Sequence, residues 1–229
     1  NSTGPSLARD RATGQLFCAW SQKDAADGKN EIYVKSYDPS VRNSAWMALA
    51  NGGSPDGRIT DTGRDSVAPK LLVQTSPTKR LWVIWQEGRS GDVLEQVMNV
   101  DLESGFYSVL DAIKSIEYEG TYIYARCYDL ETSQWDATLD YSDSTTGKTV
   151  SGNDEHSMAS RPDAVLTADG HPFVVWDYIR FSPEGGAGLT SVTKIMDAPK
   201  NNLRAIFGAV NAGGAWGTLA GVALDYENA

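Results

Sequence analysis

The chain contains little cysteine and histidine, few basic residues and no long apolar run. Its 229 residues include two cysteines and two histidines. No segment approaches the ~18 consecutive apolar residues of a membrane-spanning helix, and no signal peptide opens the chain, so we expect no membrane insertion. The 20 basic residues against 30 acidic ones give a net charge of −10. This balance argues against a nucleic-acid partner, which would need a basic surface.

The two cysteines, Cys18 and Cys127, fall in predicted strands of different repeats. We therefore expect two buried thiols rather than a disulfide. Low cysteine content, abundant tryptophan, tyrosine and glycine, and a pI near 4.6 suit a bacterial secreted or surface protein. The predicted location is therefore extracellular or at the cell surface. Since the first repeat starts almost directly at Asn1, we expect an upstream signal or pro-segment to have been removed or left out.

Almost no segment shows a 3.6-residue apolar period, which excludes a helical solenoid. Tryptophan recurs instead: six of the seven stand at two positions of a long repeat, and only Trp82 lies outside it. The first of these two positions is the last residue of the segments LFCAW, LWVIW and PFVVW, which is Trp20, Trp85 and Trp176. The second position comes a few residues after an extended segment in each repeat and is occupied by Trp46, Trp135 and Trp216.

Each repeat predicts four short antiparallel strands. A proline opens the first strand of each unit, at Pro5, Pro69 and Pro162. Glycine or proline stands in the turns between the first and second strands, as tight turns favour. The expected strands are residues 6–9, 15–20, 31–37 and one starting at 46 in the first unit; 70–73, 80–85, 122–128 and 135–141 in the second; and 164–167, 172–176, 203–210 and 216–224 in the third.

Repeated four-stranded units are typical of propeller blades, so the predicted fold class is all-β, a β-propeller with about three blades. A two-sheet sandwich is the alternative, but it does not explain why tryptophan recurs at equivalent points. We expect a single domain over residues 1–229, with blades at about 4–50, 66–141 and 160–226 and loop insertions at 86–120 and 177–202. Three blades do not close a ring. We therefore expect a second chain or copy, or a missing segment, to complete it.

Blade topology predicts where a binding site would lie. In an up-and-down sheet, the loops between the second and third strands and the links between blades emerge on one face, and the long segments of this chain are of these two kinds. Long loops on a rigid scaffold are where binding residues gather. Arginines, carboxylates and aromatic rings together suit a sugar or uronic-acid ligand. The candidate ligand-binding residues on this face are Arg64, Arg89, Arg161, Asp177, Tyr178 and Arg180.

His156 is the candidate catalytic residue. It lies in a blade link beside two carboxylates, which would favour its protonated form and suit it to acid–base chemistry. His171 lies in a tight turn on the opposite face, and we interpret it as structural. The segment 24–31 carries carboxylates and a glycine as calcium loops do, but its spacing does not match the EF-hand pattern. No cofactor is therefore predicted, and calcium stays an open alternative.

The segments SVAPKLLV…LWVIWQE, ASRPDAVLT-ADGHPFVVWDY and EIYVKSYD…W resemble the repeats of sialidase-like bacterial propellers. The resemblance covers most of the chain and implies a propeller fold. Sialidases usually carry Asp-box turns of the type Ser-x-Asp-x-Gly-x-Thr-Trp, and the nearest segment, residues 142–150, does not match. The three arginines and the Tyr/Glu nucleophile of that family have no residue-by-residue counterparts here. Some polysaccharide lyases are also similar, and that resemblance would make His156, Tyr178 and Arg161 the catalytic candidates.

The sequence leaves three hypotheses about function, because a fold alone does not determine one. The first is a secreted or cell-surface module that binds a glycan or a protein partner through its long-loop face. The second is a carbohydrate-active enzyme, either a sialidase-like glycosidase or a polysaccharide lyase, although no catalytic cluster can be recognised. The third is a structural subunit of a surface assembly, which the unfinished ring favours.

Overall fold

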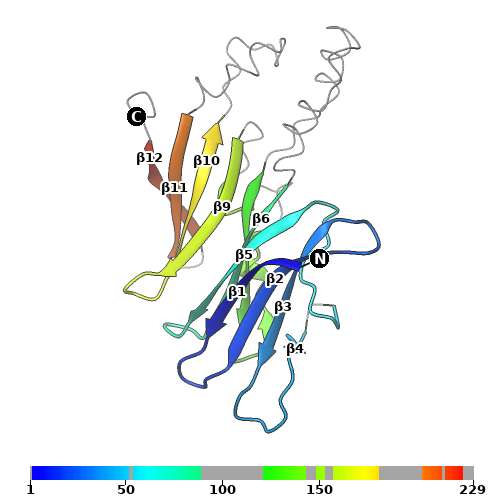
Figure 1. Cartoon of the computed structure of the whole chain (residues 1–229). Coiled ribbons are helices and arrows are strands. Elements are labelled where there is room, and N and C mark those ends of the chain that lie inside the picture. The colour runs from blue at the N-terminus through cyan, green and yellow to red at the C-terminus, as the bar shows by residue number, and fades with distance from the viewer. Residues whose placement is uncertain are drawn as a thin grey trace, which may run out of the picture.

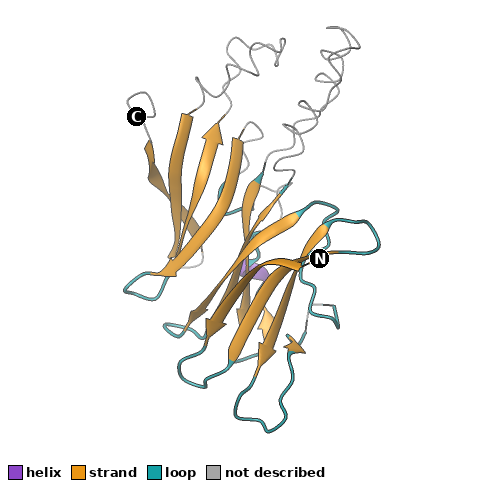
Figure 2. Ribbon diagram, viewed as in Figure 1, coloured by secondary structure: helices purple, strands orange, loops and turns teal. Residues whose placement is uncertain are grey.

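The computed structural model describes residues 2–51, 54–88, 121–142, 148–152, 157–180, 203–212 and 215–223. These residues form three four-stranded antiparallel sheets and one turn of 3-10 helix (Figures 1 and 2). Nowhere in the described part of the chain is a helix long and apolar enough to cross a membrane.

We call the three sheets blades 1, 2 and 3. Blade 1 consists of β1 (Ser2–Arg9), β2 (Leu16–Lys23), β3 (Asn30–Tyr37) and β4 (Met47–Ala48). Blade 2 consists of β5 (Ser66–Gln74), β6 (Arg80–Glu87), β7 (Tyr122–Asp129) and β8 (Gln134–Trp135). Blade 3 consists of β9 (Ser157–Leu166), β10 (Pro172–Arg180), β11 (Leu203–Ala212) and β12 (Ala215–Ala223).

Each blade is an up-and-down sheet whose strands pair in chain order. The first strand of blade 2, β5, packs against the first strands of both other blades, β1 and β9. Blade 2 therefore lies between blades 1 and 3 (Figure 1). Sheets that stack face to face with their first strands together are the blades of a β-propeller. The predicted fold class, an all-β partial propeller of about three blades, is confirmed.

The recurring tryptophans of the first position form the same cross-strand pair in every blade. Each pairs with an aromatic residue directly opposite on the third strand, and the two rings stack. The ring centroids lie 5.7 Å apart for Trp20–Tyr33, 5.9 Å for Trp85–Tyr124 and 6.5 Å for Trp176–Phe207. The repeat in the sequence thus reflects one structural unit used three times.

The core consists of two layers, one on each face of blade 2. Along β6, Leu81, Val83 and Trp85 pack against blade 1, whereas Trp82 and Ile84 pack against blade 3. A strand that is covered on both faces reads as a continuous apolar run rather than an alternating one. Trp82 lies outside the tryptophan repeat because it belongs to this second layer.

The structure corrects the expected fourth strand of blade 2. Residues 135–141 were expected to be extended, but β8 ends at Trp135 and a 3-10 turn follows at Ala137–Leu139. The Asp136 carboxylate caps this turn by accepting a hydrogen bond from the Thr138 N–H. Both cysteines are free thiols; Cys127 is buried, as predicted, whereas Cys18 is only half-buried. Of the loop insertion expected at 86–120, residues 89–120 lie outside the described residues.

Candidate functional site at the long-loop end

Strand direction divides the blades into two ends. The starts of β1, β5 and β9 lie beside the ends of β2, β6 and β10, because these strands pair antiparallel. We call this the long-loop end. The opposite end carries the turn after β1 and its counterparts in the other blades. The described candidate residues Arg64, Arg161, Asp177 and Tyr178 lie at or near the long-loop end.

A bulge at the proline of each first strand shapes this end. The residue before the proline is left-handed in all three blades, with φ of 59° at Gly4, 54° at Ala68 and 53° at Arg161. The pairing register shifts at each of these points, since proline has no N–H to donate to the ladder. A left-handed backbone costs ~1–2 kcal/mol for a residue with a Cβ. Arg161 is therefore held in a strained conformation by its surroundings.

Arg161 is positioned through its backbone and its side chain. Its N–H donates to the Gln86 side-chain oxygen at 3.0 Å, which joins blade 3 to blade 2. Its guanidinium pairs with the Asp177 carboxylate on the neighbouring strand β10, while 80% of the Arg161 side chain remains exposed. The structure therefore brings two of the predicted ligand-binding residues together, and they form a charged pair that faces solvent.

The other predicted residues do not join this pair. Tyr178 follows Asp177 on β10 and packs toward blade 2, with its ring centroid 4.4 Å from that of Phe207. Arg64 is half-buried in the link before β5. Arg180, like Asp177 and Tyr178, was expected in a loop, but β10 continues through it because it pairs with β9 and β11. Arg89 and His156 lie outside the described residues, as do the side-chain atoms of Arg180.

Sequence reasoning missed a buried carboxylate network between blades 1 and 2. Glu31 is 1% exposed; one of its carboxylate oxygens accepts a hydrogen bond from Thr60, and the other has no partner. Burial and the nearby Glu87 carboxylate raise the pKa of Glu31 to about 7, against the opposing effect of the Thr60 hydroxyl. Glu87, also buried, accepts hydrogen bonds from Ser66 and Trp85, both at 3.1 Å.

The repeat itself contained a signal for Glu31. Aligning EIYVKSYD with YIYARCYD puts Glu31 where blade 2 has Tyr122, so a carboxyl stands at a position that a neighbouring blade fills with a ring. An acidic residue at a buried repeat position is costly unless it is protonated or paired. The alignment could therefore have identified Glu31 before the structure did.

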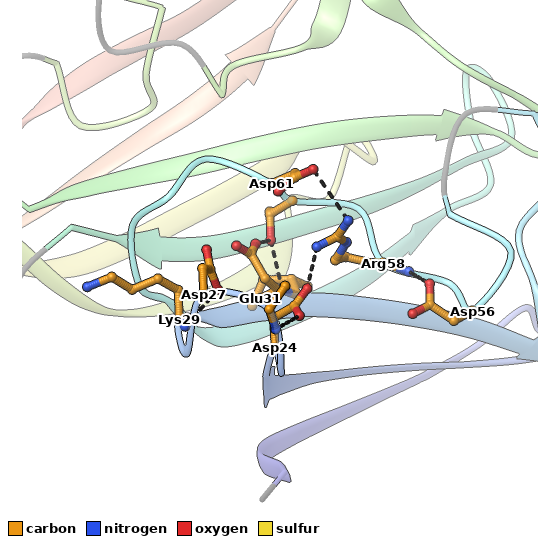
Figure 3. Close-up of polar contacts among 10 residues, drawn as sticks. Asp24, Asp27, Lys29, Glu31, Asp56, Arg58 and Asp61 are labelled. Carbon is orange, nitrogen blue, oxygen red and sulfur yellow. Dashed lines mark hydrogen bonds and ion pairs between the residues drawn. The ribbon is translucent and has the colours of Figure 1, made fainter.

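The carboxylates of segment 24–31 stabilise turns and bind an arginine (Figure 3). Asp24 accepts from the Ala26 N–H at 2.8 Å, and Asp27 from the Lys29 N–H at 2.9 Å. Arg58, on the link after β4, pairs with Asp24 and lies 3.3 Å from Asp61. In the residues that the structure describes, no group of three or more His, Cys, Asp or Glu side chains is arranged to hold a metal ion.

A cavity of about 320 Å³ lies at the other end, between blades 2 and 3. His171 lines it together with Arg80 and Asn211. The backbone N–H of His171 donates to the Thr167 hydroxyl at 3.0 Å across the tight turn. The cavity is therefore separate from the Arg161–Asp177 pair.

Comparison with known proteins shows the fold of this chain. No family model matches it, and neither does any curated protein. Among solved structures it is similar to the α-L-arabinanase of Penicillium chrysogenum complexed with arabinobiose, with 11% identity and a TM-score of 0.50 over 96% of this chain and 49% of that one. The GH93 α-L-arabinofuranosidase of Fusarium graminearum with arabinobiose gives 10% identity and a TM-score of 0.47 over 96% and 51%. The endo-arabinase of Bacteroides thetaiotaomicron gives 14% and 0.44 over 96% and 61%.

The blade arrangement and the likeness to the Penicillium structure define the class: the chain is a β-propeller protein. The expected resemblance is confirmed for propeller architecture, and its sialidase-specific part is not. The chain spans about half the length of the Penicillium and Fusarium structures.

Proposed function

We propose that this chain is a glycan-binding propeller module that contacts its ligand through Arg161 and Asp177. One observation carries the proposal: Arg161 has an 80% exposed side chain and yet is held by Gln86, by Asp177 and by a strained backbone. An ordinary surface arginine is free to rotate. A polar group fixed in advance loses little entropy when it binds a ligand.

The chemistry of the pair favours a neutral sugar over an acidic one. Asp177 balances the charge of Arg161, so the pair offers N–H donors beside carboxylate acceptors. Adjacent sugar hydroxyls both donate and accept, whereas a uronate would have to displace Asp177 from the guanidinium. The Penicillium structure, whose fold is similar, is described as an arabinanase complexed with arabinobiose. Arabino-oligosaccharides are therefore the first ligands to test, and we place the module outside the cell or at its surface.

Calorimetric titration tests the proposal. Arabino-oligosaccharides and uronate oligosaccharides are titrated into the whole chain and into Arg161→Ala and Asp177→Asn. We expect binding of the neutral series and a loss of at least tenfold in both variants, because a hydrogen bond to a charged group contributes ~1.5–3 kcal/mol. Arg42→Ala, at an exposed arginine of the opposite end, is the matched control. No binding in either series, or equal binding by Arg161→Ala, would refute the proposal.

A carbohydrate-active enzyme is the second candidate, and the Glu31–Glu87 network favours it. Glycosidases use two carboxyl groups, one of them kept protonated by its environment. Both carboxyls are buried between blades 1 and 2, so a substrate would have to reach them beneath the link that carries Arg58 and Thr60. Reducing-sugar release from arabinan, lost in both Glu31→Gln and Glu87→Gln, would support this candidate. Unsaturated products lost in His156→Ala would indicate a lyase instead.

A further inference from the structure

Each blade has two different faces, and the contacts between blades always join one kind to the other. We call the face that carries Trp20, Trp85 or Trp176 the leading face, and the opposite one the trailing face. The trailing face of blade 1, with Phe17 and Ala19, packs on the leading face of blade 2. The trailing face of blade 2, with Trp82 and Ile84, packs on the leading face of blade 3 in the same way. Among the blades that the structure describes, two apolar faces are not packed against another blade.

The leading face of blade 1 is uncovered where its counterpart in blade 2 is buried. Leu7 and Leu71 both stand two residues after the proline of their strand, yet Leu7 is 65% exposed and Leu71 7%. Trp46, in the second tryptophan position, is 43% exposed. The stacked Trp20–Tyr33 pair lies on the same face, where Trp20 is half-buried and Tyr33 is 5% exposed. The apolar side chains are those of a blade interface, but no described blade lies against them.

The trailing face of blade 3 shows the same contrast. Phe173 occupies the position of Phe17 and Trp82, which are 0% and 1% exposed, but it is only half-buried itself. Val165, opposite Phe173 on β9, is 55% exposed. A Cβ added at Gly208 would lie 2.9 Å from the Phe173 ring, so that ring lies close over the backbone of β11. Phe173 and Val165 are therefore apolar side chains of the trailing face that no described blade covers.

We propose that a second copy of this chain covers these faces and closes the ring. The trailing face of blade 3 in one copy would pack on the leading face of blade 1 in the other, just as blade 1 packs on blade 2. Because the two faces differ, a two-fold axis along the propeller axis creates two identical junctions and leaves no face open. The chain covers 49% of the Penicillium propeller, so two copies approach one full ring.

The junction would also give Asp177, at the long-loop end of blade 3, a neighbouring first strand to bond. Asp177 occupies the position of Ser21 and Gln86, one residue after the repeated tryptophan. Ser21 donates to the Ser66 carbonyl at 2.8 Å and Gln86 accepts from the Arg161 N–H at 3.0 Å, so both bond the first strand of the next blade. In the closed ring, the next first strand after Asp177 is β1 of the second copy. The Asp177 carboxylate would then lie next to the N–H of Gly4, the counterpart of Arg161.

Light scattering coupled to size-exclusion chromatography measures the oligomeric state of the whole chain. We expect twice the 24.8 kDa mass of one chain. Leu7→Asp and Val165→Lys should each give a monomer with an unchanged circular dichroism spectrum, since both positions are exposed within one chain. Val41→Asp is the matched control, because Val41 is also 55% exposed but lies in a turn on neither face. A wild-type monomer would overturn the proposal and assign these faces to blades of another polypeptide segment.

Mixing the two variants tests the head-to-tail geometry. When Leu7→Asp chains meet Val165→Lys chains, one junction keeps both native residues and the other joins the two substituted positions, whose charges are opposite. We expect the mixture to recover the dimer that neither variant forms alone. A dimer made from two leading faces would survive Val165→Lys and would not be restored by mixing. Either of those results would overturn the proposed ring.

Discussion

The indole of Trp85 lies over the ring of Tyr124 on the neighbouring strand, with the ring planes 24° apart, and donates its N–H to Glu87 at 3.1 Å. The same stacking recurs in blades 1 and 3, and in blade 2 both rings are buried beneath blade 1, with Trp85 0% and Tyr124 1% exposed. Trp85 therefore takes part in the cross-strand ring pair, in the packing of blade 2 on blade 1 and in the buried carboxylate network.

Replacing Trp85 should destabilise the protein more than replacing an exposed apolar residue of similar hydrophobicity. Trp85→Ala removes a fully buried side chain and leaves a cavity between blades 1 and 2, so we expect a loss of ~3–5 kcal/mol in the free energy of unfolding. Met47→Ala, at a position that is 64% exposed, is the control and should cost no more than ~0.5 kcal/mol. Urea denaturation followed by circular dichroism measures both values, and equal losses would contradict the assigned core.

Glu31 should make folding stability fall as the pH rises. Its pKa is raised from 4.5 to about 7 in the folded chain, so between these values the folded state holds a proton that the unfolded state has released. The proton on Glu31 therefore contributes about 3 kcal/mol to the free energy of unfolding. This contribution is complete below pH 4.5 and is lost as the pH rises through 7.

Glu31→Gln removes this dependence, because an amide does not titrate. The stability of the variant relative to wild type should therefore grow between pH 4.5 and pH 8, as measured by urea denaturation at a series of pH values. Glu131→Gln, at an exposed glutamate, serves as the control. Parallel stability curves for wild type and Glu31→Gln would exclude a raised pKa at Glu31.

The buried Asp10 carboxylate forms an ion pair with the half-buried Lys79 that joins blades 1 and 2, with 2.9 Å between the Lys79 Nζ and the carboxylate. Burial would raise the pKa of Asp10, but the bonds from Lys79, Thr13 and the Ala12 N–H together lower it to about 2. Lys79→Met should cost ~2–3 kcal/mol at pH 7, since a buried carboxylate loses its partner.

The matched control for Lys79→Met is Lys70→Met, which removes the exposed Lys70–Asp163 pair. It should change the unfolding free energy by less than ~0.5 kcal/mol. The cost of Lys79→Met should shrink as the pH falls from 3.8 toward 2, because the stability due to a lowered pKa is lost over that range. Thermal or urea unfolding at pH 2 and pH 7 checks this, and a cost that does not depend on pH would contradict the ion pair.

Substitutions at the left-handed residue of the bulge should affect the stability of the chain and its glycan binding in different ways. Ala68→Gly should stabilise the chain by a net ~0.5–1 kcal/mol, because relief of the left-handed strain exceeds the entropy that glycine adds to the unfolded state. Arg161→Gly should be at least as stable as wild type and yet lose the glycan. Ala8→Gly, in the regular part of β1, should instead destabilise by ~0.5–1 kcal/mol. Destabilisation by Ala68→Gly would show that the bulge is not strained.

Most of the strands could be predicted because their signals are local. The apolar runs at 80–85 and 122–128, the proline before each first strand and the glycine or proline in each turn lie within a few residues of the structure that they specify. The short fourth strand of blade 2 could not be predicted, because Asp136 ends it by capping a turn rather than through any change in apolar pattern.

The candidate site was harder to predict than the fold. Arg161 and Asp177 were named from the sequence, but as separate loop residues, whereas the structure pairs them on adjacent strands. Glu31 was placed at the start of an expected strand and in a calcium-like segment, but not in a carboxyl network. Its raised pKa comes first from burial and then from Glu87, which is more than fifty residues away in the chain and reaches Glu31 only through the packing of blade 2 on blade 1.

The sequence by itself determined the repeat: where tryptophan recurs, how many blades there are and which segments turn. These features follow from local propensity and from the need to fill equivalent gaps between sheets. Only the tertiary structure decided which face of each blade is covered, which carboxyl is buried beside another and which arginine is fixed but exposed. Those properties depend on contacts between residues of different blades, and a position such as Leu7 or Leu71 looks the same in the sequence whether or not a blade lies against it.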